Sequence, residues 1–166
     1  MSDADEQDAV RAGLSETEMR RRVIDLAFAG DESRYLEFLR VLRDGLPAET
    51  SAVLRGSSVT GERWEDGAPF DFEGPGASDL DLTLVGTEIL ELSDPDGGVY
   101  IPGVHTKPLC EKDPDIAPRL LPLRRRLMEL VGRPVNIQAT RDFVMLLRER
   151  LMRQPYLTLV GSVEGP

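Results

Sequence analysis

Two aspartates occupy alternate positions of an otherwise apolar segment. Asp79 and Asp81 stand in "DLDLTLV" (79–85), where leucines alternate with them. Side chains two residues apart on a strand point to the same face, with Cα atoms roughly 6.6 Å apart, so the two carboxylates can converge on a divalent cation. We predict that Asp79 and Asp81 are catalytic residues and ligands of Mg²⁺, or of Mn²⁺ in its place. The alternative is that they decorate the solvent face of an edge strand.

A glycine–serine turn precedes this segment. Gly56, Ser57 and Ser58 follow the apolar stretch "SAVLR". Glycine lets the backbone approach a phosphate closely, backbone N–H groups at a turn attract anions, and a serine hydroxyl adds a hydrogen bond. We predict that these three residues contact a phosphate group, which makes them candidate nucleotide-binding residues. A plain turn followed by a helix cap is the alternative.

The elements that must position these residues can be inferred from apolar periodicity and from capping residues. Ser15 and Glu18 form a capping box that begins a helix ending at Gly30, and the apolar stripe after Glu32 predicts a second helix to Asp44. Further on, the pattern predicts strands at 51–56, 79–85, 99–101, 133–139 and 156–161, and helices at 122–131 and 140–152, the last capped by Thr140. This order indicates an α+β fold in which helices pack on a mixed sheet.

Composition and charge restrict the function classes. The 166 residues are 40% hydrophobic and suffice for one domain, and the formal net charge is −10. The charge is −4 over residues 1–59, −11 over 60–118 and +5 over 119–166. An acidic middle argues against a general nucleic-acid-binding protein, which shows a basic patch, and is compatible with divalent cations.

The chain shows no sign of a membrane span or a secretory signal. No apolar run approaches the roughly 18 residues that a span requires, and the first residues are acidic. Cys110 is the sole cysteine, so an intramolecular disulfide is excluded. We therefore expect a cytoplasmic protein, with a disordered acidic tail at 1–14 and a single domain at 15–166 whose N-terminal helices occupy 15–47.

Taken together, these parts resemble a known family. A strand ending in Gly-Ser, a loop and Asp-x-Asp on a second strand are similar to the signature of the nucleotidyltransferase superfamily related to DNA polymerase beta. The later "LRRRLMELVGRPVNIQ" (123–138) resembles the helix and third strand of that core, particularly in minimal bacterial members. The resemblance covers about residues 50–147.

The resemblance implies a fold, a reaction and partners. The fold would be a nucleotidyltransferase-like mixed sheet packed by helices, in which Gly56 and Ser57 hold a nucleoside triphosphate and Asp79 and Asp81 bind Mg²⁺. The reaction would transfer a nucleoside monophosphate to a hydroxyl group and release pyrophosphate. The acceptor would be a small molecule or another protein, such as the toxin partner of an antitoxin.

One departure from the family concerns its third carboxylate. The family places it on the strand after "GRPV", where this chain has Asn136. Asparagine is a ligand through its carbonyl oxygen or only a polar strand residue; it brings no charge and cannot act as a general base. The chain is then a slow enzyme, recruits Glu91, Asp94 or Asp96, or is an inactive nucleotidyltransferase-like protein that binds a nucleotide or a partner. A different phosphoryl-transfer enzyme, such as a hydrolase, is a weaker alternative.

A second departure is the long loop between Ser57 and Asp79, which has 21 residues. We expect Trp64 and Phe70 to anchor this loop, with stacking on a nucleotide base as the alternative. We expect the arginines at 124–126 to form a solvated helix face. His105 and Lys107 could reach a triphosphate, although a lone loop His or Lys is usually only exposed.

Overall fold

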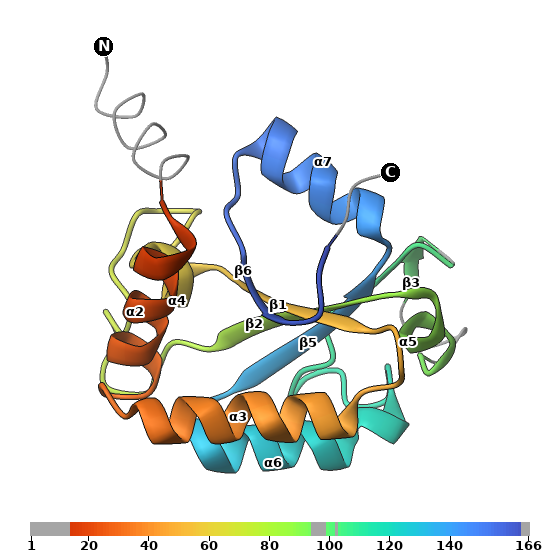
Figure 1. Cartoon of the computed structure of the whole chain (residues 1–166), viewed down its shortest axis with the longest axis horizontal. Coiled ribbons are helices and arrows are strands. Elements are labelled where there is room, and N and C mark those ends of the chain that lie inside the picture. The colour runs from red at the N-terminus through yellow and green to blue at the C-terminus, as the bar shows by residue number, and fades with distance from the viewer. Residues whose placement is uncertain (1–13, 94–98, 102, 164–166) are drawn as a thin grey trace.

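The computed structural model describes residues 14–93, 99–101 and 103–163. Within them, a six-stranded mixed sheet has the strand order β3-β4-β5-β2-β1-β6, and helices cover both faces (Figure 1). Of the predicted tail, only Leu14 is described, and it packs against the core. In chain order the elements are α2 (Glu16–Ala27), α3 (Glu32–Gly45), β1 (Ser51–Arg55), α4 (Ser57–Thr60), β2 (Leu80–Val85), α5 (Thr87–Glu91), β3 (Val99–Ile101), β4 (His105–Thr106), the 3₁₀ helix η1 (Pro118–Leu120), α6 (Leu121–Val131), β5 (Val135–Thr140), α7 (Asp142–Met152) and β6 (Leu157–Val160).

The fold confirms the expected α+β class and the two N-terminal helices. The capping box of Ser15 and Glu18 begins α2, and Asp31 caps α3 by accepting a hydrogen bond from the Arg34 amide. Gly132 ends α6 in the left-handed conformation that glycine adopts without strain. The expected edge strand at the C-terminal end is β6, which pairs with β1.

The predicted cap of the last helix was wrong. Thr140 belongs to β5, where it pairs with His105 of β4, and Arg141 precedes α7 without a side-chain cap. Tertiary pairing with β4 keeps Thr140 in the sheet, which local sequence does not reveal. The short elements α4, α5 and β4 are absent from the elements expected from sequence, because elements of two to five residues leave little periodicity to read.

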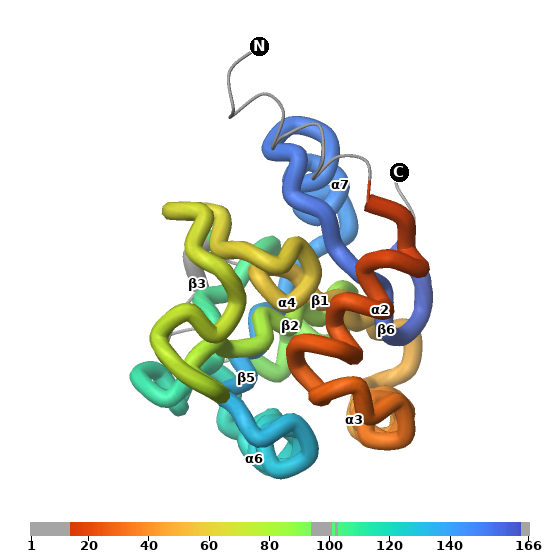
Figure 2. Tube along the Cα trace, turned by 90° about the vertical axis from the view of Figure 1, so that its left-hand side faces the viewer, coloured from red at the N-terminus to blue at the C-terminus, as the bar shows by residue number. Residues whose placement is uncertain are grey.

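One face of the sheet holds the main core. Leucines 80, 82 and 84 of β2 are buried there with apolar residues of β1 and β5, and α2, α3 and α6 cover them. Figure 1 shows α3 and α6 side by side beneath the sheet, and Figure 2 shows the same layer from another side. The predicted alternation of leucines is therefore confirmed, and it fixes the register of β2.

The other face of β2 is covered only in part. α7 lies above it (Figure 1), and Met145 packs there on Val53 and Val85. Thr83 is completely buried beneath this layer. Towards the amino end of β2 the cover stops, so Asp79 and Asp81 lie where the polar face opens.

Candidate functional site

The candidate site begins with a row of polar residues across three strands. Arg55 at the end of β1 pairs with Asp81 of β2, and Asp81 lies beside Asn136 of the parallel strand β5. Because side chains in register on neighbouring strands share a face, all three project to the side of α7. Asp79, immediately before β2, extends the row by one position on the same face.

The glycine turn contacts this row directly. Gly56 has a φ of +82°, and a Cβ atom built on it would lie 2.7 Å from Asp81 Oδ2. Any side chain at position 56 would therefore strike the carboxylate as well as strain the backbone. The turn and the aspartate pair, 25 residues apart from Gly56 to Asp81 in the chain, form one local structure.

A cavity of about 490 Å³ opens at this point. Its lining includes Gly56, Ser57, Asp79 and Asp81, together with Trp64 from the long loop. The volume falls in the usual range of small-molecule sites, roughly 300–1,000 Å³. The structure thus brings four of the predicted site residues to one cavity.

The electrostatics of the aspartate pair favour a cation. Burial, and secondly the charge of Asp79, raise the pKa of Asp81 to about 6, while Arg55 acts against them. Two ionised carboxylates repel each other in a partly buried site, and a bound cation would reduce that repulsion. The oxygen donors suit Mg²⁺, which binds through one or two carboxylates and keeps other positions for substrate phosphates.

Asn136 lies against both aspartates. Its Nδ2 atom donates to Asp79 Oδ2 at 2.6 Å and, more distantly, to Asp81 Oδ1 at 3.5 Å. In this orientation the amide stabilises the carboxylates, and its Oδ1 atom becomes a ligand only if the amide turns over. Among the described residues, no group of three or more His, Cys, Asp and Glu side chains could hold a metal ion. A bound metal would therefore take its protein ligands from two carboxylates and one amide.

Other predicted residues lie away from the cavity. Ser58 is buried, and its hydroxyl has no hydrogen-bond partner in the described part of the chain. Glu91 is exposed at the end of α5, which follows the carboxyl end of β2, whereas Asp79 precedes the amino end. Asp94 and Asp96 lie outside the described residues. The role of Ser58 and the recruitment of a loop carboxylate stay predictions.

Two arginines near the site were missed. Arg55 lines the cavity, and its Nε donates to Thr83 Oγ1 at 2.9 Å and its Nη2 to Gln138 Oε1 at 3.2 Å. Arg148 of α7 donates to the same Gln138 oxygen at 3.5 Å and to His105 Nε2 at 3.1 Å. Strand alternation could have placed Arg55 beside Asp81, but no local signal connects Arg148 with the sheet.

Arg133 anchors the long loop beneath the site. It forms an ion pair with Asp71, with Nη1 to Oδ1 at 2.8 Å, and its guanidinium lies 4.5 Å from the centre of the Phe70 ring. It also donates to the carbonyl oxygen of Ser78, the residue before Asp79. The anchoring role predicted for Phe70 is confirmed, and the ion pair holds the loop end that leads into Asp79.

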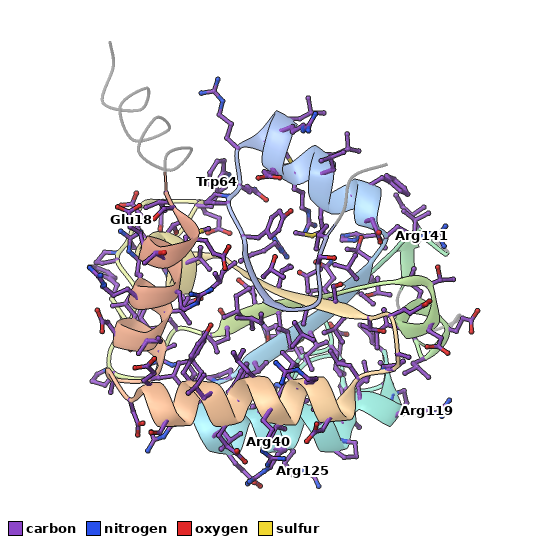
Figure 3. The ribbon with its side chains drawn as sticks, viewed as in Figure 1. Glu18, Arg40, Trp64, Arg119, Arg125 and Arg141 are labelled. Atoms are coloured by element: carbon purple, nitrogen blue, oxygen red, sulfur yellow. The ribbon has the colours of Figure 1, made fainter. Side chains whose placement is uncertain are left out.

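Trp64 has a different placement from Phe70. It is 40% exposed, it lines the cavity, and Figure 3 shows it above the sheet on the side of α7. It therefore has an accessible face beside the aspartates. Stacking on a base, given as the alternative from sequence, suits this placement.

The arginines of α6 serve mainly as the expected solvated face. Arg125 is exposed and points away from the sheet in Figure 3, and Arg126 forms an exposed pair with Glu129. Arg124 differs, because its Nε donates to the Val135 carbonyl oxygen at 2.7 Å. It thereby ties α6 to the start of β5, one residue before Asn136.

Comparisons with protein-family models, with curated proteins and with solved structures found no match to this chain. Within the described ranges, no helix has the length and apolarity needed to traverse a bilayer.

Proposed function

We propose that the chain is a Mg²⁺-dependent nucleotidyltransferase that moves a nucleoside monophosphate from a triphosphate to a hydroxyl group of a protein or small molecule. One observation carries the proposal. The Gly56 backbone lies against the carboxylate of Asp81 so closely that no side chain fits between them, in a cavity that Ser57 and Asp79 also line. A turn that can bind phosphate, beside two carboxylates that can bind Mg²⁺, would support nucleotidyl transfer, because the metal would neutralise the phosphate oxygens that the turn holds.

Each group has a separate task in binding. The turn offers backbone N–H groups and the Ser57 hydroxyl to the phosphates, and the missing side chain at Gly56 allows close approach. Arg55 adds a positive charge at the cavity wall. Trp64 offers an apolar face to the base, which aromatic side chains bind without regard to sequence.

Asp79, Asp81 and, after turning its amide, Asn136 would hold the metal. Bound Mg²⁺ supplies charge neutralisation for phosphate oxygens and orients the reacting groups. Asp81 must be ionised to serve, and a bound cation favours that ionised form. With asparagine at position 136, no carboxylate stands there to take the acceptor proton, which predicts a slow transfer.

The direct test measures nucleotide binding and turnover together. We expect calorimetry to detect ATP or another nucleoside triphosphate only with Mg²⁺ present, and Asp79→Asn to abolish that binding. Incubation with each labelled triphosphate and a cell lysate should label an acceptor and release pyrophosphate. Asp81→Ala should stop both, whereas the exposed Arg125→Ala should not. Metal-independent turnover that persists in Asp81→Ala would contradict the proposal.

A second candidate function is binding without turnover. The hydrogen bonds of Asn136 to both aspartates favour it, because the amide already compensates the carboxylates that a cation would otherwise compensate. In that case nucleotide binds with Mg²⁺ but no pyrophosphate appears with any acceptor. The same two measurements therefore separate the candidates.

A further inference from the structure

A cluster of cations lies beneath α7, beyond the aspartate pair. Arg55 and Arg148 come from β1 and α7, and both donate to the single Oε1 atom of Gln138. Their guanidinium groups are thus held on one acceptor, close to each other and to the polar face of the sheet. Arg55 also lines the cavity, so the cluster borders the candidate site.

The two arginines share one nearby negative charge, that of Asp81, which acts to raise the pKa of each. In the part of the chain that the structure describes, no carboxylate lies within ion-pair distance of Arg55 or Arg148, and Arg55 Nη1 has no acceptor. Burial lowers the pKa of both groups, and the charge of Arg55 lowers that of Arg148 further, to about 10. Two half-buried cations that share one carboxylate outside ion-pair distance leave an excess positive charge, which is costly to keep, as expected where a ligand supplies the missing negative charge.

The surrounding hydrogen bonds hold the two guanidinium groups in place. Arg148 can only donate, so His105 Nε2 accepts from it, and Nδ1 carries the proton that bonds Thr140 Oγ1 at 2.9 Å. Gln138 Nε2 then donates to the carbonyl oxygen of Thr106 and to His105 Nε2. Burial and the two arginine charges lower the pKa of His105 to about 4, which keeps the ring neutral and an acceptor.

We propose that Arg55 and Arg148 form an anion subsite beside the aspartate pair, which takes a phosphate or carboxylate group of a bound substrate. Paired guanidinium groups match the planar geometry of such anions and bind them through charge-assisted hydrogen bonds. Gln138 and His105 are positioning residues for this pair. The identity of the anion as part of a substrate rests on the proposed function, whereas the affinity for an anion does not.

The test uses inorganic pyrophosphate in the presence of EDTA, so that no metal takes part. We expect pyrophosphate to bind the wild-type chain and raise its Tm. Arg148→Gln should weaken that binding about tenfold to a hundredfold. The control is Arg150→Gln, on the same helix and exposed, which should leave the affinity unchanged.

The aspartates separate this inference from the proposed function. Asp79→Asn should strengthen metal-free pyrophosphate binding, because a repelling charge is removed, yet abolish Mg²⁺-dependent nucleotide binding. If pyrophosphate binds in this way but nucleotide never does, the subsite stands and the proposed function fails. If Arg148→Gln weakens pyrophosphate and nucleotide equally, the subsite takes the nucleotide phosphates; if only pyrophosphate weakens, it takes an anionic group of the acceptor.

Stability provides the second readout. If Arg148 served only the fold, its removal would lower the Tm. Because burial and the charge of Arg55 both disfavour the Arg148 cation, its removal should instead leave the Tm unchanged or raise it. Arg148→Lys retains the charge but not the planar fork, and it should bind pyrophosphate with intermediate affinity. Equal pyrophosphate affinity in the wild type, Arg148→Gln and Arg150→Gln, or no binding by the wild type, would overturn the inference.

Discussion

The amide of Asn136 donates to Asp79 Oδ2 at 2.6 Å, directly beside the position of Asp81 in the neighbouring strand. The residue that departs from the nucleotidyltransferase pattern therefore contacts both residues that match it. The Asn136 amide is a neutral hydrogen-bond donor, so the two aspartates can remain ionised without a bound cation. A carboxylate at position 136 would instead add a third negative charge and bind a cation more tightly.

Asn136→Asp should lower the stability of the metal-free protein and raise its affinity for Mg²⁺. A third carboxylate beside Asp79 and Asp81 adds like-charge repulsion, so we expect a lower Tm in EDTA. With Mg²⁺ the extra ligand should tighten metal binding about tenfold or more and speed any transfer. The measurement is the Tm as a function of Mg²⁺ concentration. Asn136→Ala, which removes the amide without adding charge, should show no such gain, and an equal response of both variants would contradict the assignment.

Asp81 should make the free energy of unfolding depend on pH. Its pKa is about 6 in the folded chain against an ordinary value of 3.8, so between these values the folded state retains a proton that the unfolded chain releases. The stability contributed by Asp81 is therefore full below 3.8 and falls as the pH rises to about 6, by roughly 3 kcal/mol at most.

Denaturant unfolding of the wild type and Asp81→Asn at several pH values measures this contribution. The variant should be the more stable protein at pH 7 and should lack the decline between pH 4 and 6. Asp71, whose pKa the Arg133 ion pair lowers to about 2, loses its stabilisation only below this window. Parallel curves for the two proteins would contradict the burial of Asp81.

Gly56→Ala should damage the site more than the fold. The Gly56 backbone, with a φ of +82° and a ψ of −159°, is a conformation that essentially only glycine adopts and that costs other residues about 1–3 kcal/mol, and the new Cβ would also displace the Asp81 carboxylate. Gly30→Ala is a matched control, because Gly30 has a φ of +78° and nothing lies within 4 Å of its Cβ position. Both variants should lose backbone stability, but only Gly56→Ala should weaken nucleotide binding, by tenfold or more, in calorimetry.

Trp64 should report on the nucleotide. It is the only tryptophan and it lines the cavity, so a base stacking on it should quench the intrinsic fluorescence of the chain. Trp64→Leu should weaken nucleoside triphosphate binding about tenfold, since stacking contributes about 1–3 kcal/mol per base, but leave the affinity for pyrophosphate unchanged. Equal losses for both ligands would indicate that Trp64 only anchors the loop.

Arg133 should be required for the loop that leads into Asp79. Its side chain is 8% exposed and pairs with Asp71, so Arg133→Ala leaves a partly buried carboxylate unpaired and should cost about 3 kcal/mol of the free energy of unfolding. Limited proteolysis should then cut within residues 62–77. The exposed Arg125→Ala should change neither the free energy of unfolding nor the proteolysis pattern. Restored stability in the double variant Asp71→Asn with Arg133→Met would confirm that the unpaired Asp71 charge causes the loss.

Local sequence sufficed for the parts of the fold with clear periodicity. The alternation around Asp79 and Asp81 predicted a strand with a buried leucine face, and the Ser15 capping box predicted the start of α2. The Gly56 turn could be placed near the aspartates only through the family resemblance, since the two segments are distant in the chain. The structure places them in contact.

The remaining parts depend on tertiary contacts that leave no local pattern. In the sequence, Gln138 is an ordinary polar strand residue. Only the structure shows that Arg55 and Arg148 both donate to its side-chain oxygen. Thr140 looks like a helix cap, but pairing with His105 keeps it in β5. Strand alternation placed Thr83 on the same face as Asp79 and Asp81, but it could not reveal that Thr83 is buried on that face.

The cavity wall includes Gln154 and Pro155, which join α7 to β6, and β6 pairs with β1 at the edge of the sheet. The compartment for a small molecule is therefore closed by a segment that follows Gly56 and both aspartates in the chain. A nascent chain that holds Gly56 and both aspartates cannot yet enclose a nucleotide, because the segment at Gln154 and Pro155 is synthesised after them.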